Sequence, residues 1–104
     1  MVIIVEFSLI PLGVNESLSK ILAYAIKELE RMNVKFQVTP MCTIFEAESI
    51  DEAFNVVKVC HETIIKQGVK RILTSVKIDD RRDIERKDMM EKVKSLKDKL
   101  KSMS

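Results

Sequence analysis

The chain contains no tryptophan, one tyrosine, two glycines, two prolines, two cysteines and one histidine among its 104 residues. With only Gly13 and Gly68 available, a glycine-rich phosphate loop cannot form, so nucleotide chemistry has no support in the sequence. The scarcity of glycine and proline also leaves no flexible linker, and a hydrophobic content of 46% argues against disorder. We therefore expect a single ordered domain over residues 1–104.

The cysteines and the histidine are too few and too far apart to form a metal centre or a disulfide framework. Cys42 and Cys60 form no CxxC pair, and together with His61 they lack the ligand spacing of zinc or iron–sulfur sites. His61 follows Cys60 directly, but neighbouring residues on a helix diverge by about 100° and do not face each other. We therefore expect reduced thiols, no metal, no cofactor and no catalytic pair.

Charge is nearly balanced, because 18 basic and 16 acidic side chains are mixed along the chain and leave a net charge of +2. This mixture gives no strong electrostatic footprint for nucleic acid, and the basic bias of residues 92–101 is typical of a solvated helix face. The longest apolar run, Met1 to Val5, is far too short for a membrane span and lacks the form of a secretory signal. We expect a cytoplasmic protein with neither a nucleic-acid nor a membrane partner.

Hydrophobic periodicity predicts four strands and three helices. The expected strands are residues 2–9, 35–40, 43–48 and 71–78, and the expected helices are residues 18–32, 50–64 and 89–103. Pro11 and Gly13 should end the first strand, and Asn15 or Ser17 can cap the first helix. Asn33 tolerates the left-handed conformation that stops a helix.

The second helix has the clearest sequence signals. Ser49 and Glu52 form a capping box, and Gly68 is a good helix stop. Its expected apolar stripe is Ile50, Ala53, Phe54, Val57, Cys60 and Ile64. The last helix carries a narrow apolar seam, which is Met89, Val93, Leu96, Leu100 and Met103. This seam could cover the chain's own sheet or pack against another subunit.

The order β-α-β-β-α-β followed by a helix predicts an α+β fold, a ferredoxin-like sandwich with an additional C-terminal helix. The first and third strands then lie in the middle of an antiparallel sheet, with both main helices on one face. Alternation along the strands should point Ile3, Val5, Phe7 and Phe45 toward the helices. The side chains expected on the face without helices, here called the open face, are Glu6, Ser8, Gln37, Ile44, Glu46, Leu73, Ser75 and Lys77.

Three interpretations of the open face remain. Glu6 and Glu46 could pair with Lys77 or Arg71 in a self-associating surface, they could form a pocket for a cationic or amine-bearing ligand, or they could simply be solvated. RNA-binding domains of the RRM type share the element order, but they expose stacking aromatics that are absent from this face. An ACT-like regulatory domain would also share the topology.

The hairpin carries a resemblance to a known family. Pro40, Met41, Thr43 and Glu46 resemble the pattern Pro-Met-Gly-Thr followed closely by Glu-Gly of the thiamine-binding family. The resemblance extends from Ser8 and Pro11 in the first strand, through residues 69–72, to residues 78–81. Cys42 and Ala47 stand at the two glycine positions of the pattern. Glycine can allow positive φ or close approach of a ligand, so a Cβ at either place could narrow a pocket.

The resemblance implies a non-catalytic protein that binds thiamine or its hydroxymethylpyrimidine moiety and assembles as a homotetramer of ferredoxin-like subunits. Glu46 could accept a hydrogen bond from the exocyclic amine of the pyrimidine, while Thr43 and Ser8 satisfy ring nitrogens. Glu6 adds a second carboxylate to this expected site. The alternative is a structural or regulatory homo-oligomer, similar to ACT domains, that does not bind thiamine.

Overall fold

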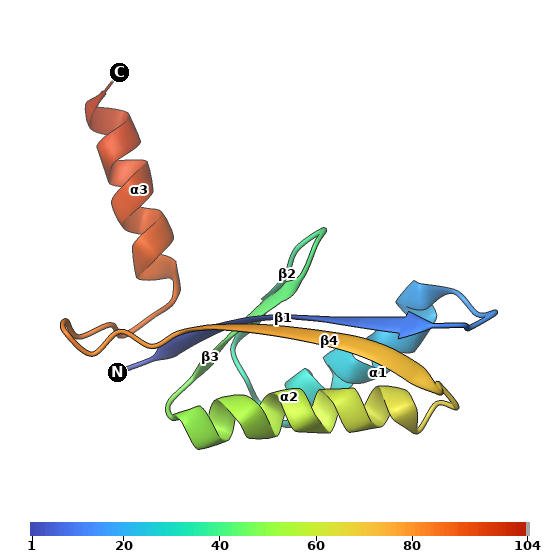
Figure 1. Cartoon of the computed structure of the whole chain (residues 1–104). Coiled ribbons are helices and arrows are strands. Elements are labelled where there is room, and N and C mark those ends of the chain that lie inside the picture. Colours follow the sequence, from blue (N-terminus) through green and yellow to red (C-terminus); the bar gives the residue numbers. More distant parts are fainter. Residues whose placement is uncertain (104) are drawn as a thin grey trace.

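The computed structural model describes residues 1–103 and shows four strands and three helices (Figure 1). The elements in chain order are β1 (Ile3–Leu12), α1 (Leu18–Arg31), β2 (Phe36–Val38), β3 (Thr43–Ala47), α2 (Ile50–Ile65), β4 (Arg71–Asp79) and α3 (Met90–Ser102). The predicted βαββαβ order with an additional C-terminal helix is confirmed.

The strands form one antiparallel sheet in the order β2-β3-β1-β4. β1 pairs with β3 from Ile3 opposite Ala47 to Phe7 opposite Thr43, and it pairs with β4 over nine consecutive positions. The middle places of β1 and β3 are therefore confirmed. β4 forms one edge of the sheet over its whole length.

The core lies between the sheet and the two helices α1 and α2. Alternate residues of β1 are buried, and Phe45 in β3 is fully buried. The rings of Phe7 and Phe45 meet edge to face, with centroids 5.4 Å apart and planes at 86°. The predicted inward direction of these side chains is confirmed, and no stacking aromatic lies on the middle strands of the open face.

β1 continues through Pro11 to Leu12, so the prediction that Pro11 ends this strand is wrong. The N–H of Glu46 donates to the carbonyl of Lys35, which directs the even-numbered backbone groups of β3 toward β2 and the odd-numbered ones toward β1. By the same alternation, the nitrogen of Pro11 points to the β3 side of β1. β3 has already ended at Thr43 there, so the missing N–H costs no ladder hydrogen bond.

The helix signals are confirmed with two exceptions. Ser49 caps α2 by accepting a hydrogen bond from the N–H of Glu52 at 3.0 Å, and Gly68 takes a left-handed φ of 90° after the helix. Asn33 takes a φ of 57° after α1. One exception is Phe54, which the stripe placed in the core but which is 54% exposed, while Val56 is buried instead. The other is the predicted cap of α1, because Ser17 stands at the N-cap position but its side chain makes no capping hydrogen bond.

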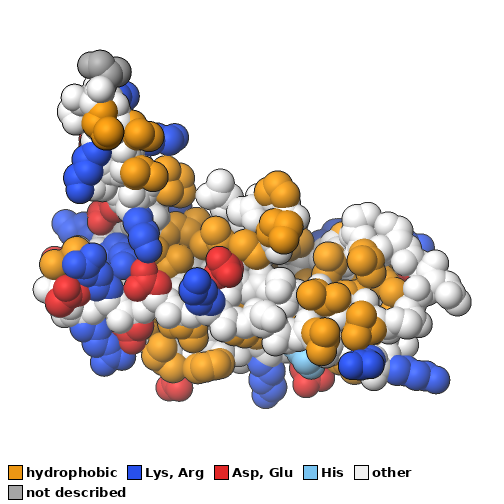
Figure 2. All heavy atoms as spheres, turned by 45° about the horizontal axis from the view of Figure 1, so that its top comes forward, with side chains coloured by type: hydrophobic (Ala, Val, Ile, Leu, Met, Phe, Trp, Pro, Cys, Tyr) orange, Lys and Arg blue, Asp and Glu red, His pale blue; other side chains and the backbone are white. Residues whose placement is uncertain are grey.

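α3 projects away from the sheet, and none of its residues is buried (Figure 1). Its seam remains open along Val93, Leu96 and Leu100, with Leu96 61% exposed. Figure 2 shows hydrophobic side chains gathered along α3 and across the neighbouring open face. Within the chain, α3 thus covers only the part of the sheet beside its first turn. No helix among residues 1–103 combines the length and the apolar character that crossing a membrane requires.

Candidate functional site

A groove of about 510 Å³ lies between the open face of the sheet and the start of α3. Its volume is within the range of small-molecule sites. The lining residues are Ile4, Glu6, Gln37, Ile44, Lys77, Ile78, Asp79, Met89, Met90, Lys92 and Val93. The groove therefore combines apolar walls with two carboxylates, Glu6 and Asp79, and two amines, Lys77 and Lys92. All four strands contribute lining residues, and the rest come from the first turn of α3 and from Met89 just before it.

Glu6 and Lys77 lie opposite each other on β1 and β4 in the floor of the groove. Neither side chain makes a hydrogen bond or an ion pair within residues 1–103, so the interpretation in which Glu6 pairs with Lys77 or Arg71 is not realised within a single chain. The carboxylate of Glu6 is exposed and keeps its acceptor capacity for another molecule.

Glu46 has a different role from Glu6, because its carboxylate is already occupied. Its Oε2 accepts a hydrogen bond from the backbone N–H of Met89 at 2.8 Å and lies 3.7 Å from Nζ of Lys35. The side chain of Glu46 is 13% exposed. Glu46 therefore holds Met89, a lining residue of the groove, and the start of α3 against the open face.

A second carboxylate supports the same junction. Asp88 accepts hydrogen bonds from the Nζ of Lys35 and, at 2.6 Å, from the backbone N–H of Met90. The hydrogen bond from Lys35, followed by that from Met90, lowers the pKa of Asp88, and the same hydrogen bond to Asp88 raises the pKa of Lys35. Both ions are thus held in their charged forms beside the first turn of α3.

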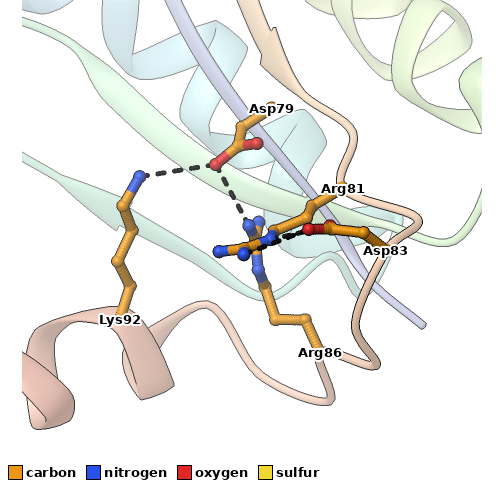
Figure 3. A network of polar contacts seen from close by, with 5 residues as sticks. All are labelled: Asp79, Arg81, Asp83, Arg86 and Lys92. Carbon is orange, nitrogen blue, oxygen red and sulfur yellow. Dashed lines mark hydrogen bonds and ion pairs between the residues drawn. The ribbon is translucent and has the colours of Figure 1, made fainter.

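Asp79, at the end of β4, links the sheet to the following loop and to α3 (Figure 3). Its Oδ2 lies 3.1 Å from the guanidinium of Arg86 and 3.4 Å from Nζ of Lys92. Burial opposes ionisation of Asp79, but the charge of Arg86 and the hydrogen bonds from Lys92 and Arg86 outweigh it and lower the pKa of this carboxyl. Nη1 of Arg86 is buried without a hydrogen-bond partner among residues 1–103. The charge of this buried guanidinium is therefore balanced by its ion pair with Asp79.

The structure brings three of the four predicted site residues to the open face. Glu6 lines the groove, Ser8 lies two residues farther along β1 opposite Ser75, and Glu46 accepts the hydrogen bond from the lining residue Met89. Thr43 lies on the other face, because it pairs with the inward-pointing Phe7. Within one subunit, Thr43 and Glu46 therefore do not share a site.

Sequence reasoning missed part of the groove. The lining residues not predicted are Ile4, Ile78, Asp79, Met89, Met90, Lys92 and Val93. The alternation that places Glu6 on the open face also places Ile4 and Asp79 there, so the sequence contained a signal for these two residues. No local pattern indicates that the first turn of α3 returns to this face, since that contact depends on Glu46, which is distant in sequence.

The two positions at which the chain departs from the glycines of the family pattern do not obstruct the groove. Ala47 is 1% exposed and pairs with Ile3, so its Cβ points into the core on the opposite face. Cys42 lies in the turn between β2 and β3, where the hydroxyl of Thr39 donates to its carbonyl at 2.9 Å. Asn33 is the one non-glycine residue with positive φ among residues 1–103, so Cys42 carries no left-handed strain.

The thiols and the histidine lie away from the groove and form no nucleophilic pair. Burial raises the pKa of Cys60 to about 12, so this thiol stays protonated, and its Sγ lies 3.6 Å from the carbonyl of Ala25. Nδ1 of His61 lies 2.6 Å from the hydroxyl of Thr74 in β4. Cys42 and Cys60 are both free, and residues 1–103 contain no cluster of three potential metal ligands.

Comparison with known proteins places the chain among small proteins of the same size. Residues 5–97 match the family model described as thiamine-binding protein. A "UPF0045 protein" of Methanothermobacter thermautotrophicus is 42% identical over 96 residues, which cover 91% of this chain and 96% of that protein. A UPF0045 protein of Staphylococcus xylosus is 37% identical over 98 residues, covering 89% of this chain and 90% of its own length.

Solved structures share the fold. The protein MJ1052 of Methanocaldococcus jannaschii superimposes with a TM-score of 0.81 at 32% identity, covering 92% of this chain and 96% of its own. A Thermotoga maritima protein, named as a candidate thiamine biosynthesis or salvage protein, superimposes with a TM-score of 0.76 and covers 92% of this chain and 99% of its own. Its identity of 23% supports the likeness of the fold alone.

Proposed function

Because the chain belongs to the thiamine-binding protein family, we propose that it binds thiamine or its hydroxymethylpyrimidine moiety in the groove between the open face and α3. The binding is non-catalytic and serves thiamine homeostasis in the cytoplasm. The observation that carries the proposal is the coincidence of the family match with a groove that has apolar walls and an unpaired carboxylate on its floor.

The chemistry of the groove suits an aminopyrimidine. Ile4, Ile44 and Val93 offer apolar surface to a flat ring, and Glu6 can accept a hydrogen bond from the exocyclic amine. Ser8 lies next on the same face and can reach a ring nitrogen. Glu46 was expected to accept from the amine, but its carboxylate accepts the hydrogen bond from the N–H of Met89, and its role here is to position α3.

Isothermal titration calorimetry tests this proposal with thiamine and with hydroxymethylpyrimidine. If Glu6 accepts from the ligand amine, Glu6→Gln should weaken binding by about 1.5 to 3 kcal/mol, the scale of a hydrogen bond to a charged group. Glu30→Gln is the matched control, because Glu30 is an exposed carboxylate on α1, on the other side of the sheet. This control should bind like the wild type.

Glu46→Gln separates the two carboxylates. As a residue that positions α3, it should weaken binding and also change the protection of residues 89–93 against amide hydrogen exchange. Glu6→Gln should leave that protection unchanged. If neither ligand gives heat or a melting shift at millimolar concentration, the thiamine proposal is wrong. The alternative, an ACT-like homo-oligomer with a structural or regulatory function, would then be favoured.

We also propose a homotetramer as the functional assembly. The open seam of α3, with Leu96 61% exposed and Leu100 56% exposed, is an apolar surface that the single chain leaves uncovered. The open face continues this surface beside the groove. Both are expected to be buried between subunits, so that the groove is closed by a neighbouring chain.

A further inference from the structure

The outer edge of β4 is a long row of unpaired backbone groups. The hydrogen bond from Glu46 to Lys35 directs the odd-numbered residues of β3 toward β1, and the pairing registers then direct Leu73, Ser75 and Lys77 toward β1. The N–H and C=O groups that face outward from β4 therefore belong to Ile72, Thr74, Val76 and Ile78. No backbone hydrogen bond within residues 1–103 reaches these outward groups.

This edge lacks a proline, a bulge and an inward-pointing charge, and its charged side chains, Arg71, Lys77 and Asp79, lie on the open face. β4 has nine residues, contains no proline, and pairs with β1 without a bulge. Val76 is 38% exposed on it. The opposite edge, β2, has only three residues. A long, regular edge is a template for another strand, whereas a short edge is protected by its length.

We infer that β4 pairs antiparallel with β4 of a second copy of this chain, with Ser75 at the two-fold axis. This inference rests on the proposed homo-oligomer and adds its register. A two-fold axis perpendicular to the sheet allows only registers that pair residues on the same face, and the one centred on Ser75 pairs all of Arg71–Asp79.

The side chains of β4 are self-complementary in this register. Arg71 lies opposite Asp79 of the second copy, so opposite charges meet at both ends. Ile72 lies opposite Ile78, and Thr74 lies opposite Val76. Moving the centre to Thr74 would instead place Arg71 opposite Lys77, and moving it to Val76 would leave Arg71 beyond the paired strand. Charge therefore selects the Ser75 register and a second copy as the occupant.

α2 supplies an independent indication that this side of the molecule is covered. His61 contacts Thr74 of β4, and Phe54 lies seven residues earlier on the same side of α2. The ring of Phe54 is 54% exposed, although the neighbouring residues of the stripe are buried. Pairing of the β4 edges would bring the second copy's α2 toward this ring.

The pairing would also extend the ligand groove across the two-fold axis. Lys77 and Asp79 line the groove, and in the Ser75 register they lie opposite Leu73 and Arg71 of the second copy. The second copy thus adds a guanidinium and an apolar side chain to the rim of the groove. The two grooves of the pair open on the same face of one continuous sheet of eight strands.

A cysteine at the two-fold axis tests the register in the full-length chain. Ser75 forms a non-hydrogen-bonded pair with its own copy, in which Cα atoms are about 4.5 Å apart, close enough for a disulfide. With Cys42→Ser in every variant, Ser75→Cys should form a covalent dimer on non-reducing gels under oxidised glutathione. Lys77→Cys is the matched control, because its copies would be about 13 Å apart.

Val76→Pro tests the backbone pairing itself. It removes an outward N–H and leaves the ladder with β1 intact, so it should reduce the mass measured by light scattering, while Val76→Thr should not. If Ser75→Cys does not cross-link, or if Lys77→Cys cross-links equally fast, the β4 register is wrong. If the wild type is still oligomeric in that case, the homotetramer proposal stands and only the β4 pairing is wrong. If the wild type is monomeric, both proposals are wrong.

Discussion

At the scale of single residues, the two carboxylates expected to bind the same ligand have different tasks. Glu6 and Glu46 lie on the same face of the sheet, but the carboxylate of Glu46 accepts from the backbone of Met89, while that of Glu6 has no partner within residues 1–103. An acceptor that already serves a buried N–H is costly to redirect. Glu6 is therefore the better candidate for ligand recognition.

Asp79 should make the stability of the protein sensitive to acid. Its pKa is lowered in the folded chain, so the folded state binds fewer protons than the unfolded state near the ordinary value of 3.8. Its contribution is therefore present above this value and is lost as the pH falls through the lowered pKa. Thermal unfolding followed by circular dichroism should show a falling Tm below about pH 4.

Asp79→Asn should lower the Tm at pH 6 and reduce the further loss at pH 3, because the ion pair with Arg86 is already absent. Asp98→Asn, on an exposed part of α3, should leave both values close to the wild type. An equal acid response of the wild type and Asp79→Asn would show that other carboxyls cause the loss.

At the scale of elements, the two main helices begin in different ways. The side chain of Ser49 caps α2, whereas the hydroxyl of Ser17, at the start of α1, makes no capping bond and lies 2.8 Å from that of Ser19. The capping box of α2 is also extended, since the carboxylate of Glu52 accepts from the N–H of Glu48 at 3.2 Å. Only the start of α2 therefore depends on capping side chains.

Ser49→Ala should destabilise the protein by about 1 kcal/mol, the usual cost of removing an N-cap side chain. Ser17→Ala is the matched control and should change the free energy of unfolding by a few tenths of a kcal/mol at most, because no capping bond is lost. Urea unfolding at constant protein concentration gives both values. Equal losses would contradict the difference in capping.

At the scale of the whole molecule, the position of α3 determines how much apolar surface the single chain leaves exposed. It leaves the sheet after its first turn, so its seam and the remaining open face are both uncovered (Figure 1, Figure 2). A chain of this size rarely exposes so continuous an apolar surface without a partner. The proposed tetramer is the simplest means of covering it.

Leu96→Glu should therefore break the assembly into smaller species, because it places a charge in the seam of α3. Lys97→Gln changes the net charge by the same amount on an exposed neighbouring position and should leave the assembly intact. Light scattering at micromolar concentration gives the masses. A monomeric wild type at this concentration would refute the tetramer.

The sequence by itself determined the element order, the inward direction of Phe7 and Phe45, and the ends of the helices at Ser49, Asn33 and Gly68. These features follow from local physics: alternation along strands, capping groups and residues that tolerate positive φ. The family resemblance of the hairpin likewise needed only the chain order. Phe54 was misplaced because a stripe of helical spacing fixes a direction only to within a part of the helix circumference.

Only the tertiary structure decided the composition of the groove. Glu46 and Met89 are distant in sequence, and their hydrogen bond, together with that between Lys35 and Asp88, places α3 over the end of the open face. The separation of Thr43 from Glu46, by contrast, already follows from alternation along residues 43–48, and the pairing of Thr43 with Phe7 confirms it. Contacts between distant segments depend on register and on loop path, and no local pattern specifies either.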